Sequence, residues 1–175
     1  MQRGDTSVKR IGPLCILSES EEDTRKLGAF MAGFLRENGL RILLKGGLGV
    51  GKTVLVRGFC EALGFMKVRS PSFTLVNQYK AGDKTIIHSD LYRLESNDVE
   101  DLELDNGEEE STIVFVEWAE KGAFSSDFPT WELSFDTPAA SISACERIIT
   151  FRSLDREGER LLSSFICSVS EVISE

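Results

Sequence analysis

The sequence predicts an α/β fold: a three-layer sandwich in which helices flank a mostly parallel central sheet that also carries an antiparallel hairpin. Three observations support this. A short apolar run at residues 40–44 leads into a glycine-rich loop and then a helical pattern, the order of a strand, a turn and a helix. The continuous β-branched and aromatic run at residues 112–116 is typical of a buried central strand. Two half-apolar runs, at residues 73–79 and 85–88, flank a polar turn as in a hairpin.

The glycine-rich loop at residues 46–53 matches the pattern G-x-x-x-x-G-K-T. Its glycines let the backbone curl until successive amides point into one concavity, and the following helix directs its positive end to the same point. Lys52 is then placed to reach the β- and γ-phosphates of a nucleotide, and the Thr53 hydroxyl to hold Mg²⁺. The sequence therefore predicts a P-loop NTPase-like fold that binds a nucleoside triphosphate.

The remaining elements are predicted in chain order from the same kind of signal. Residues 1–13 are expected to be a loose lead-in, and residues 14–17 a short edge strand. Ser18 and Ser20 each precede an acid at capping-box spacing, so a helix should begin there and end near residue 38. The other predicted elements are a helix at 54–63 stopped by Gly64, a short helix at 98–104, strands at 131–135 and 147–151, and a closing amphipathic helix from residue 155.

Composition narrows the class of protein. The chain has 175 residues and a formal net charge of −9, which argues against a broad nucleic-acid-binding surface. No run approaches the roughly 20 apolar residues that span a bilayer, and no repeat or linker interrupts the chain. We therefore expect one cytoplasmic domain without a membrane partner. The four cysteines contain no C-x-x-C pair, and Cys60 and Cys167 fall in helical apolar patterns, so both are expected to be buried thiols.

Two predicted strands end in carboxylates. Glu117 follows the run at 112–116, and Asp90 follows residues 86–88. In P-loop enzymes an acid at the end of a neighbouring strand organises Mg²⁺ or the attacking water, so both are candidates. A carboxylate at a strand end is also a common surface residue, and the pattern alone does not decide between the two. His88 is the only histidine, and we interpret it as structural rather than as a general base.

Several further residues have both a functional and a structural interpretation. Ser70, Ser72 and Thr74 lie where a switch-like loop could sense the γ-phosphate, or they are ordinary strand hydroxyls. Trp118 either covers the nucleotide or a partner, or fills the core. The pattern Asp-x-x-Gly at residues 155–158 imitates a GTPase, but no guanine-reading N-K-x-D follows it. A GTP-dependent switch protein is therefore disfavoured.

Four motifs in order resemble the TsaE (YjeE) family, the small bacterial ATPases of tRNA threonylcarbamoyladenosine biosynthesis. They are the P-loop at residues 46–53, S-P-S-F-T-L-V at 70–76, H-S-D-L-Y-R-L at 88–94 and V-E-W at 116–118. The resemblance covers residues 18–122, and four ordered motifs are far more specific than a P-loop alone.

The resemblance implies a weak ATPase that depends on ATP and Mg²⁺ and works with TsaB and TsaD partners. Those partners transfer threonylcarbamoyl to the adenosine beside the anticodon, so tRNA would be met only through that complex. By the same resemblance Lys52, Asp90 and Glu117 would be catalytic, and Thr53 would join the two acids at the metal. The implied nucleotide contacts are Glu21, Thr24, Gly46, Gly47, Leu48, Gly49, Val50, Gly51, Lys52, Thr53, Val54 and Trp118.

The sequence departs from the family pattern at two positions. Gly47 stands where the family usually has Asp or Glu, which leaves the hydrolysis rate open, and Ser72 replaces a Thr. Two other functions remain as alternatives. One is a small-molecule kinase with Asp90 as the base, although the arginine-rich lid of a kinase is not visible. The other is a nucleotide-gated scaffold with negligible catalysis.

Overall fold

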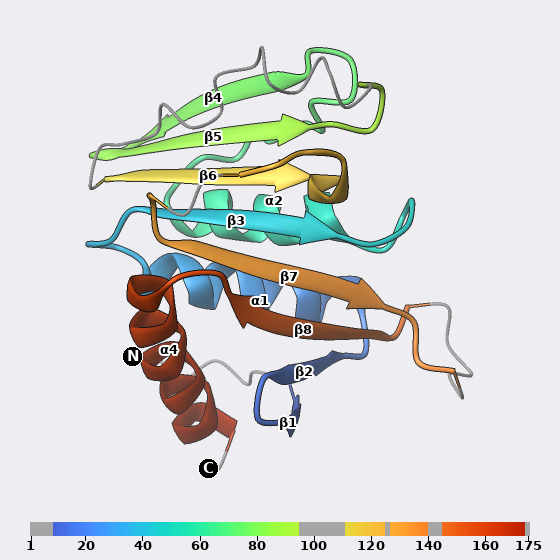
Figure 1. Ribbon diagram of the computed structural model, residues 1–175, viewed down its shortest axis with the longest axis vertical. Coiled ribbons are helices and arrows are strands. Elements are labelled where there is room, and N and C mark those ends of the chain that lie inside the picture. Colours follow the sequence, from blue (N-terminus) through green and yellow to red (C-terminus); the bar gives the residue numbers. More distant parts are fainter. Residues whose placement is uncertain (1–8, 95–110, 125–126, 140–144, 174–175) are drawn as a thin grey trace.

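The computed structural model describes residues 9–94, 111–124, 127–139 and 145–173, with side chains up to residue 169. Its strands form one sheet in the order β1-β2-β8-β7-β3-β6-β5-β4 (Figure 1). The strands are β1 (Lys9–Gly12), β2 (Cys15–Ser18), β3 (Leu40–Lys45), β4 (Val76–Ala81), β5 (Lys84–Asp90), β6 (Thr112–Glu117), β7 (Thr130–Asp136) and β8 (Arg147–Ser153). The helical elements are α1 (Glu21–Phe34), α2 (Lys52–Ala62), the 3-10 turn η2 (Ala119–Lys121) and α4 (Arg156–Ile173).

The centre of the sheet is parallel. β7, β3, β6 and β5 run in the same direction, and β4 pairs with β5 as an antiparallel hairpin. The α/β, P-loop NTPase-like fold expected from the sequence is confirmed. At the other side β8, β2 and β1 add an antiparallel extension. All parallel strands therefore end at one edge, where the loop between β3 and α2 also lies (Figure 1).

Local sequence signals set the helix ends. The hydroxyl of Ser20 caps α1 by accepting a hydrogen bond from the amide of Asp23 at 3.1 Å. Gly51, in the left-handed conformation at φ 105°, precedes α2, and Gly64 at φ 87° follows its end. A side chain at Gly51 would be strained, so the glycine permits the sharp entry into α2.

α1 and α2 pack with their backbones in contact. A Cβ atom at Gly28 would lie 2.1 Å from the carbonyl oxygen of Leu55, and one at Gly58 would lie 2.0 Å from that of Arg25. The helices can approach this closely only because both positions lack a side chain. The contact fixes α2, and with it the P-loop, relative to α1.

Helices α1 and α4 share one apolar core with the sheet. The ring centroid of Phe165 on α4 lies 5.6 Å from that of Phe30 and 5.4 Å from that of Phe34, both on α1. It also packs 5.4 Å from Trp131 of β7 and 5.5 Å from Phe151 of β8. A smaller cluster on the opposite sheet face contains Leu43, Leu91, Val114, Val116 and Ala119.

The Asp-x-x-Gly pattern is a helix start. Asp155 accepts hydrogen bonds from the amides of Gly158 and Thr130, each at 2.7 Å, and so begins α4 against the first residue of β7. Trp131 adds an indole N–H bond to the carbonyl of Gly158 at 2.8 Å. The resemblance of this segment to a GTPase motif is therefore explained by capping and packing.

Some expectations differ from the structure. Residues 9–12 form β1, paired with β2, where the sequence predicts a loose lead-in. β4 begins at Val76 rather than near residue 73, because the amides of Thr74 and Leu75 bond to the Pro71 carbonyl in a turn. The helix predicted at residues 98–104 lies outside the described residues.

The cysteine expectation is half right. Cys60 is fully buried in α2, and burial raises the pKa of its thiol to about 12. Cys167 is exposed, so its predicted burial is wrong. Its neighbours Phe165 and Ile166 take the inward positions of α4.

The close helix crossing generates a stability prediction. We expect Gly58→Ala to lower the free energy of unfolding by about 1–3 kcal/mol, because the added methyl overpacks a backbone contact. Gly33→Ala is the matched control, since a Cβ at Gly33 of α1 meets nothing within 4 Å. That variant should gain up to about 1 kcal/mol. Urea unfolding measures both, and equal effects of the two substitutions would contradict this packing.

Candidate functional site

The loop between β3 and α2 has the backbone that phosphate binding requires. Gly46, Gly49 and Gly51 all adopt positive φ, at 130°, 73° and 105°. A Cβ at Gly46 would also lie 2.7 Å from the carbonyl oxygen of Phe135, so a larger residue is excluded there on two grounds. The N-cap residue of α2 is Gly51, which has no side chain to cap the first turn. The amides of that turn and the positive end of α2 are thus available to an anion.

Lys52 is held over this loop. Its side chain is buried, and its ammonium donates to the carbonyls of Gly46 at 2.6 Å and Gly47 at 2.8 Å. The ammonium also lies 4.3 Å from the ring centroid of Trp118. Burial lowers the pKa of Lys52, and the nearby carboxylates of Glu117, Glu120 and Asp90 oppose that shift. A phosphate would supply the negative charge that such a buried ammonium lacks.

The two candidate acids end neighbouring strands side by side. Asp90 of β5 and Glu117 of β6 are directly paired in the parallel register, and both are buried. Glu117 accepts a hydrogen bond from Thr53 Oγ1 at 2.6 Å. Asp90 accepts from Ser72 Oγ at 2.7 Å and from the Tyr92 amide at 2.9 Å. The structure thus brings together residues that are up to 64 positions apart in the chain.

These groups line one hollow of about 190 Å³ at the mouth of the P-loop. Ser70 and Ser72 line it too, with their hydroxyls 2.5 Å apart. Thr74 instead donates to the side chain of Asn77 at 2.8 Å and is not among the described lining residues. The described lining consists of Leu48, Gly49, Val50, Gly51, Lys52, Thr53, Val54, Ser70, Ser72, Asp90, Tyr92, Glu117 and Trp118.

Trp118 has an uncommon backbone conformation. Its φ of 58° and ψ of 39° are left-handed, which costs a bulky residue about 1–3 kcal/mol. Its half-buried ring packs 4.9 Å from Tyr92 and covers the Lys52 ammonium. Such strain is found most often at functional positions. Here it directs the ring over the hollow immediately after Glu117.

A second hollow, of about 240 Å³, adjoins the P-loop on the side of α1. It contains Glu21 and Thr24, the two residues expected from the family resemblance to approach adenine. It also contains Cys145 and Arg147, which sequence reasoning missed. Arg147 donates from Nε to the Val50 carbonyl at 3.1 Å and so braces the loop from β8. No motif marks these two residues, because only the folding of β8 beside β2 and β7 brings them here.

Comparison with known proteins identifies the family. The sequence-family model described as threonylcarbamoyl adenosine biosynthesis protein TsaE matches residues 18–147, more than half of the chain. The chain belongs to the TsaE family. The resemblance seen in the four motifs is confirmed, and the match continues past them through β7 to the first residue of β8.

Individual relatives agree with this assignment. The tRNA threonylcarbamoyladenosine biosynthesis protein TsaE of Bacillus subtilis is 33% identical over 141 residues, which cover 80% of this chain and 85% of the relative. The protein of that name from Aquifex aeolicus is 40% identical over 109 residues, or 61% and 77% of the two chains. The crystal structure of Bacillus subtilis YdiB matches with a TM-score of 0.65 at 26% identity, over 90% of this chain and 95% of that one. TsaE membership and the P-loop geometry together indicate a nucleotide-binding function.

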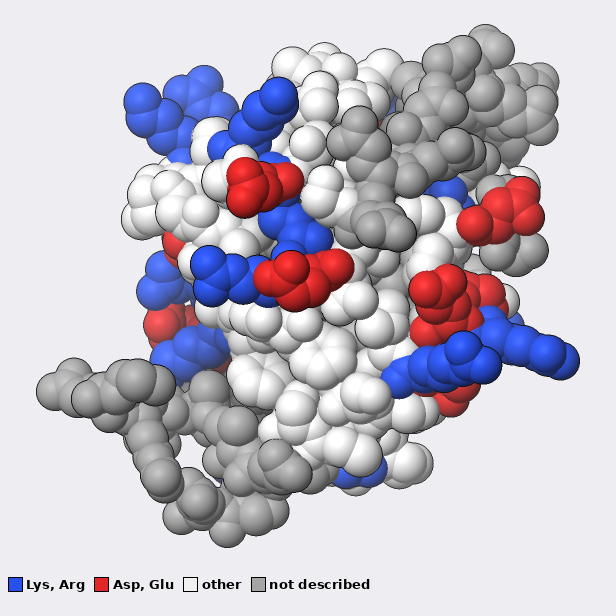
Figure 2. Space-filling model, turned by 90° about the vertical axis from the view of Figure 1, so that its left-hand side faces the viewer, with Lys and Arg blue, Asp and Glu red and all other residues white. Residues whose placement is uncertain are grey.

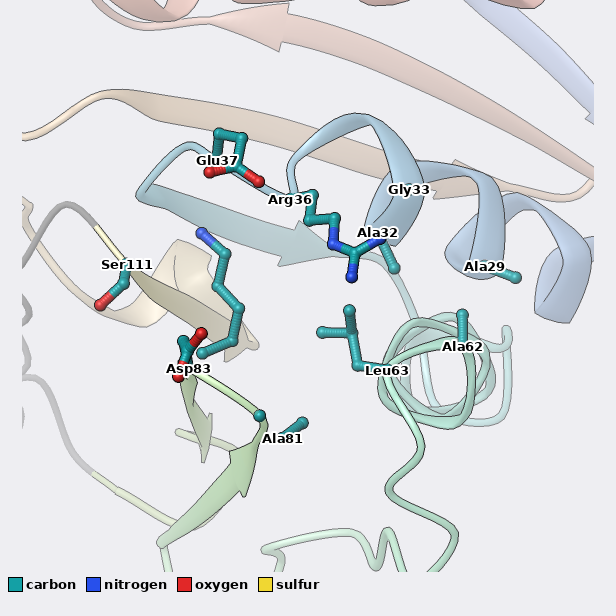
Figure 3. A pocket seen from close by; sticks show the side chains of 12 residues that line it. Ala29, Ala32, Gly33, Arg36, Glu37, Ala62, Leu63, Ala81, Asp83 and Ser111 are labelled. Atoms are coloured by element: carbon teal, nitrogen blue, oxygen red, sulfur yellow. The ribbon is translucent and has the colours of Figure 1, made fainter.

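A larger cavity of this TsaE family member lies at the opposite edge of the sheet, where β5 and β6 begin (Figure 3). Its volume is about 730 Å³, and its charged lining residues are Arg36, Glu37, Asp83 and Lys84. Arg36 extends toward Leu63, while Glu37 and Asp83 lie on the other side of the space (Figure 3). Its mixed charges and its lack of P-loop residues, among the described lining, make the smaller hollow the better nucleotide site.

The surface at the end of the sheet where β5 and β6 begin has mixed charge. Lys and Arg side chains alternate with Asp and Glu over the described part of this face, without a patch of one sign (Figure 2). Broad electrostatic binding of a nucleic-acid backbone needs clustered cations, so this face is not suited to it. Within the described ranges, the helices are also too short or too polar to cross a bilayer.

The burial of Lys84 should make the stability of the protein depend on pH. Lys84 is buried, its ammonium donates to the Asn38 carbonyl at 2.7 Å, and burial lowers its pKa against the weaker influence of Glu37. The unfolded chain then binds this proton more tightly than the folded protein does. We expect the wild type to gain stability relative to Lys84→Met as pH rises from 7 toward the ordinary lysine value of 10.5. Urea unfolding at several pH values measures the difference.

The exposed Lys80 of β4 supplies the control for that experiment. Lys80→Met measures the effect of removing a lysine from an exposed position of the same hairpin over the same pH range. A Lys84→Met difference that is constant over this range, or that moves in the other direction, would show that the Lys84 ammonium is not desolvated.

Proposed function

We propose that this TsaE family member binds ATP with Mg²⁺ in the P-loop hollow and hydrolyses it slowly in support of tRNA threonylcarbamoyladenosine biosynthesis. The observation that carries the proposal is the meeting of Thr53, Asp90 and Glu117 beside the P-loop in one hollow. The role in the tRNA modification follows the names of the curated relatives. TsaB- and TsaD-like proteins are the proposed partners, and tRNA is met through them.

The residues fit both ligands. Left-handed glycines and the uncapped start of α2 form an amide cradle that suits phosphate oxygens, and Lys52 adds a buried ammonium at its rim. Thr53, Asp90 and Glu117 offer hard oxygen atoms, the ligands that Mg²⁺ prefers, directly or through its waters. A metal held by these residues would supply positive charge against the charge that develops on the phosphates during hydrolysis.

The chain's own groups account for the reaction. Lys52 and the loop amides hold the β- and γ-phosphates, and Glu117 or Asp90 orients a water in line with the γ-phosphorus. The oxygen of that water forms a bond to phosphorus while the bond to the bridging oxygen breaks, and the proton that the water loses passes to the phosphate, so that ADP and phosphate are released. The described lining of this hollow contains no arginine. Lys52 is the cation in that described lining, and an arginine that stabilises the transition state would come from a partner, which supports slow intrinsic turnover and stimulation by that partner.

The kinase alternative is weaker. A kinase also needs a lid with arginines over its acceptor pocket, and the described lining of this hollow contains no arginine. Asp90 accepts hydrogen bonds from Ser72 and from the Tyr92 amide. These bonds suit an acid with a fixed position, such as a ligand to metal-bound water. The scaffold alternative differs from the proposal only in turnover, which the variants below measure.

The proposed partner contact also has structural support. Large apolar side chains stand exposed near the hollow: Leu48 is 79% exposed, Phe73 is 83% exposed and Tyr92 is 47% exposed. The Arg93 guanidinium lies 4.4 Å from the ring centroid of Phe73 and gives this surface a cation. Exposed aromatic and arginine side chains of this kind are typical of protein interfaces. We propose that the partner covers the nucleotide there.

Substitutions in the hollow test the ATPase. Lys52→Ala should lose nucleotide binding, whereas Asp90→Asn and Glu117→Gln should keep it and lower kcat on the order of 100-fold. Calorimetry with a non-hydrolysable ATP analogue and phosphate release with Mg²⁺ measure the two properties. Asp83→Asn, an acid at the opposite edge, is the control. Wild-type hydrolysis by both carboxylate variants would refute the site assignment.

A pull-down with the two expected partners, with and without ATP, tests the biological role. Phe73→Ser should weaken partner binding by about tenfold or more, as loss of a central aromatic contact does. Met66→Ser is the matched control, because Met66 is 69% exposed and is not among the described residues of the hollow. Equal binding by both variants would exclude this surface. Binding that survives in Glu117→Gln, with no hydrolysis in the wild type, would favour the scaffold.

A further inference from the structure

His88 lies directly behind the two acids. It is the only histidine of the chain and is fully buried. Side chains alternate along a strand, so His88 and Asp90 project from the same face of β5 as Ile86, toward the large apolar core. In the parallel register His88 pairs with Phe115, and Asp90 pairs with Glu117. The imidazole therefore lies two residues before Asp90 on the same face of β5, and it has no access to solvent.

Two donors converge on one oxygen of Glu117. Thr53 Oγ1 donates to Oε1 at 2.6 Å, and His88 Nε2 lies 2.9 Å from the same oxygen. Nδ1 of His88 has no hydrogen-bond partner among the described residues. If the only ring proton were on Nδ1, Nε2 and Oε1 would face each other as two acceptors. We therefore assign a proton to Nε2 from the hydrogen-bond network.

We propose that His88 is a positioning residue that fixes the orientation of Glu117. Its Nε2–H keeps Oε1 turned toward Thr53, so that Oε2 remains for a water in the P-loop hollow. This inference rests on the proposed ATPase function, in which the direction of Glu117 matters. His88 does not touch the substrate, because it is buried and is not among the described residues of the hollow. It acts through Glu117.

Thr53 alone would hold Glu117 less firmly. Its oxygen is also the proposed ligand of Mg²⁺, so the same atom serves two partners during each cycle. His88 has no second hydrogen-bond partner among the described residues, and its strand is paired with that of Glu117 along the whole length of β6. A donor from a rigid neighbouring strand keeps its direction when the nucleotide enters or leaves.

A packing role does not account for an imidazole here. Its Nδ1 is buried without a partner among the described residues, and such burial of a polar atom destabilises a fold. Ile86 and Phe115 beside it fill the same core without that cost. The property that His88 has and these side chains lack is an N–H donor within reach of Glu117.

Two substitutions separate the donor from the volume. His88→Leu fills the space without a donor, whereas the amide of His88→Gln can reach the position of Nε2. We expect His88→Leu to lower kcat by about 10- to 100-fold, as loss of an orienting partner does, with KM for ATP changed less than about threefold. His88→Gln should recover most of kcat. An equal loss in both variants would overturn the proposal.

Folding of the variants is checked by thermal unfolding. If His88→Leu does not fold, His88→Asn replaces it, because its shorter amide does not reach Oε1. The expectation is the same: Asn should lose kcat and Gln should keep it. A fully active His88→Asn protein would refute the positioning role.

A double substitution tests whether His88 acts through Glu117. In the Glu117→Gln background, His88→Leu should reduce kcat little further, because both changes affect one carboxylate. Losses that multiply would show that His88 acts independently of Glu117 and would overturn the proposal.

Nitrogen-15 NMR of histidine-labelled protein gives a readout besides activity. The single histidine yields one set of ring signals, and we expect a proton on Nε2 whose signal shifts in Glu117→Gln. A proton on Nδ1 alone, or no response to Glu117→Gln, would refute the proposal. Wild-type protein no more active than Lys52→Ala would instead refute the proposed ATPase, while the NMR result would still decide whether His88 holds Glu117.

Discussion

The parallel register of β5, β6 and β3 is the constraint on which the site depends. It places Asp90 opposite Glu117 and Glu117 opposite Leu44, the residue before the last of β3, so the acids and the start of the P-loop meet at one edge. A slip of one residue in either pairing would turn an acid to the other face of the sheet, away from Thr53. Buried apolar side chains along β6 make such a slip costly, because they would lose their places in the core.

The position of α2 depends on a second contact. Gly28 and Gly58 let α1 and α2 pack backbone to backbone, and this crossing holds the helix whose first turn carries Lys52 and Thr53. Arg147 braces the loop itself from β8. The amide cradle is therefore held from the helix layer and from the sheet, which limits the reorganisation that phosphate binding requires.

The site places several polar groups where a core would favour apolar ones. Lys52, His88, Asp90 and Glu117 are all buried, and the pKa of Lys52 is lowered by that burial. Their hydrogen bonds link the P-loop, β5 and β6 into one network. These hydrogen bonds fix the directions of the side chains, although Nδ1 of His88 has no partner among the described residues. A bound phosphate would supply the counter-charge for the Lys52 ammonium. Burial of these polar groups lowers the stability of the fold locally, and their hydrogen bonds give the side chains of the site defined positions.

The sequence by itself determined the P-loop, the order of most elements and the two strand-end acids, because glycine spacing, capping residues and apolar periodicity are local signals. It also determined the family through four motifs. Only the tertiary structure decided which hydroxyl groups donate hydrogen bonds to Asp90 and Glu117, and that His88 lies within hydrogen-bond distance of Glu117. It also decided that Arg147 reaches the Val50 carbonyl and that residues 9–12 join the sheet. Those facts depend on strand order and register between distant segments, and no local pattern encodes which strands become neighbours.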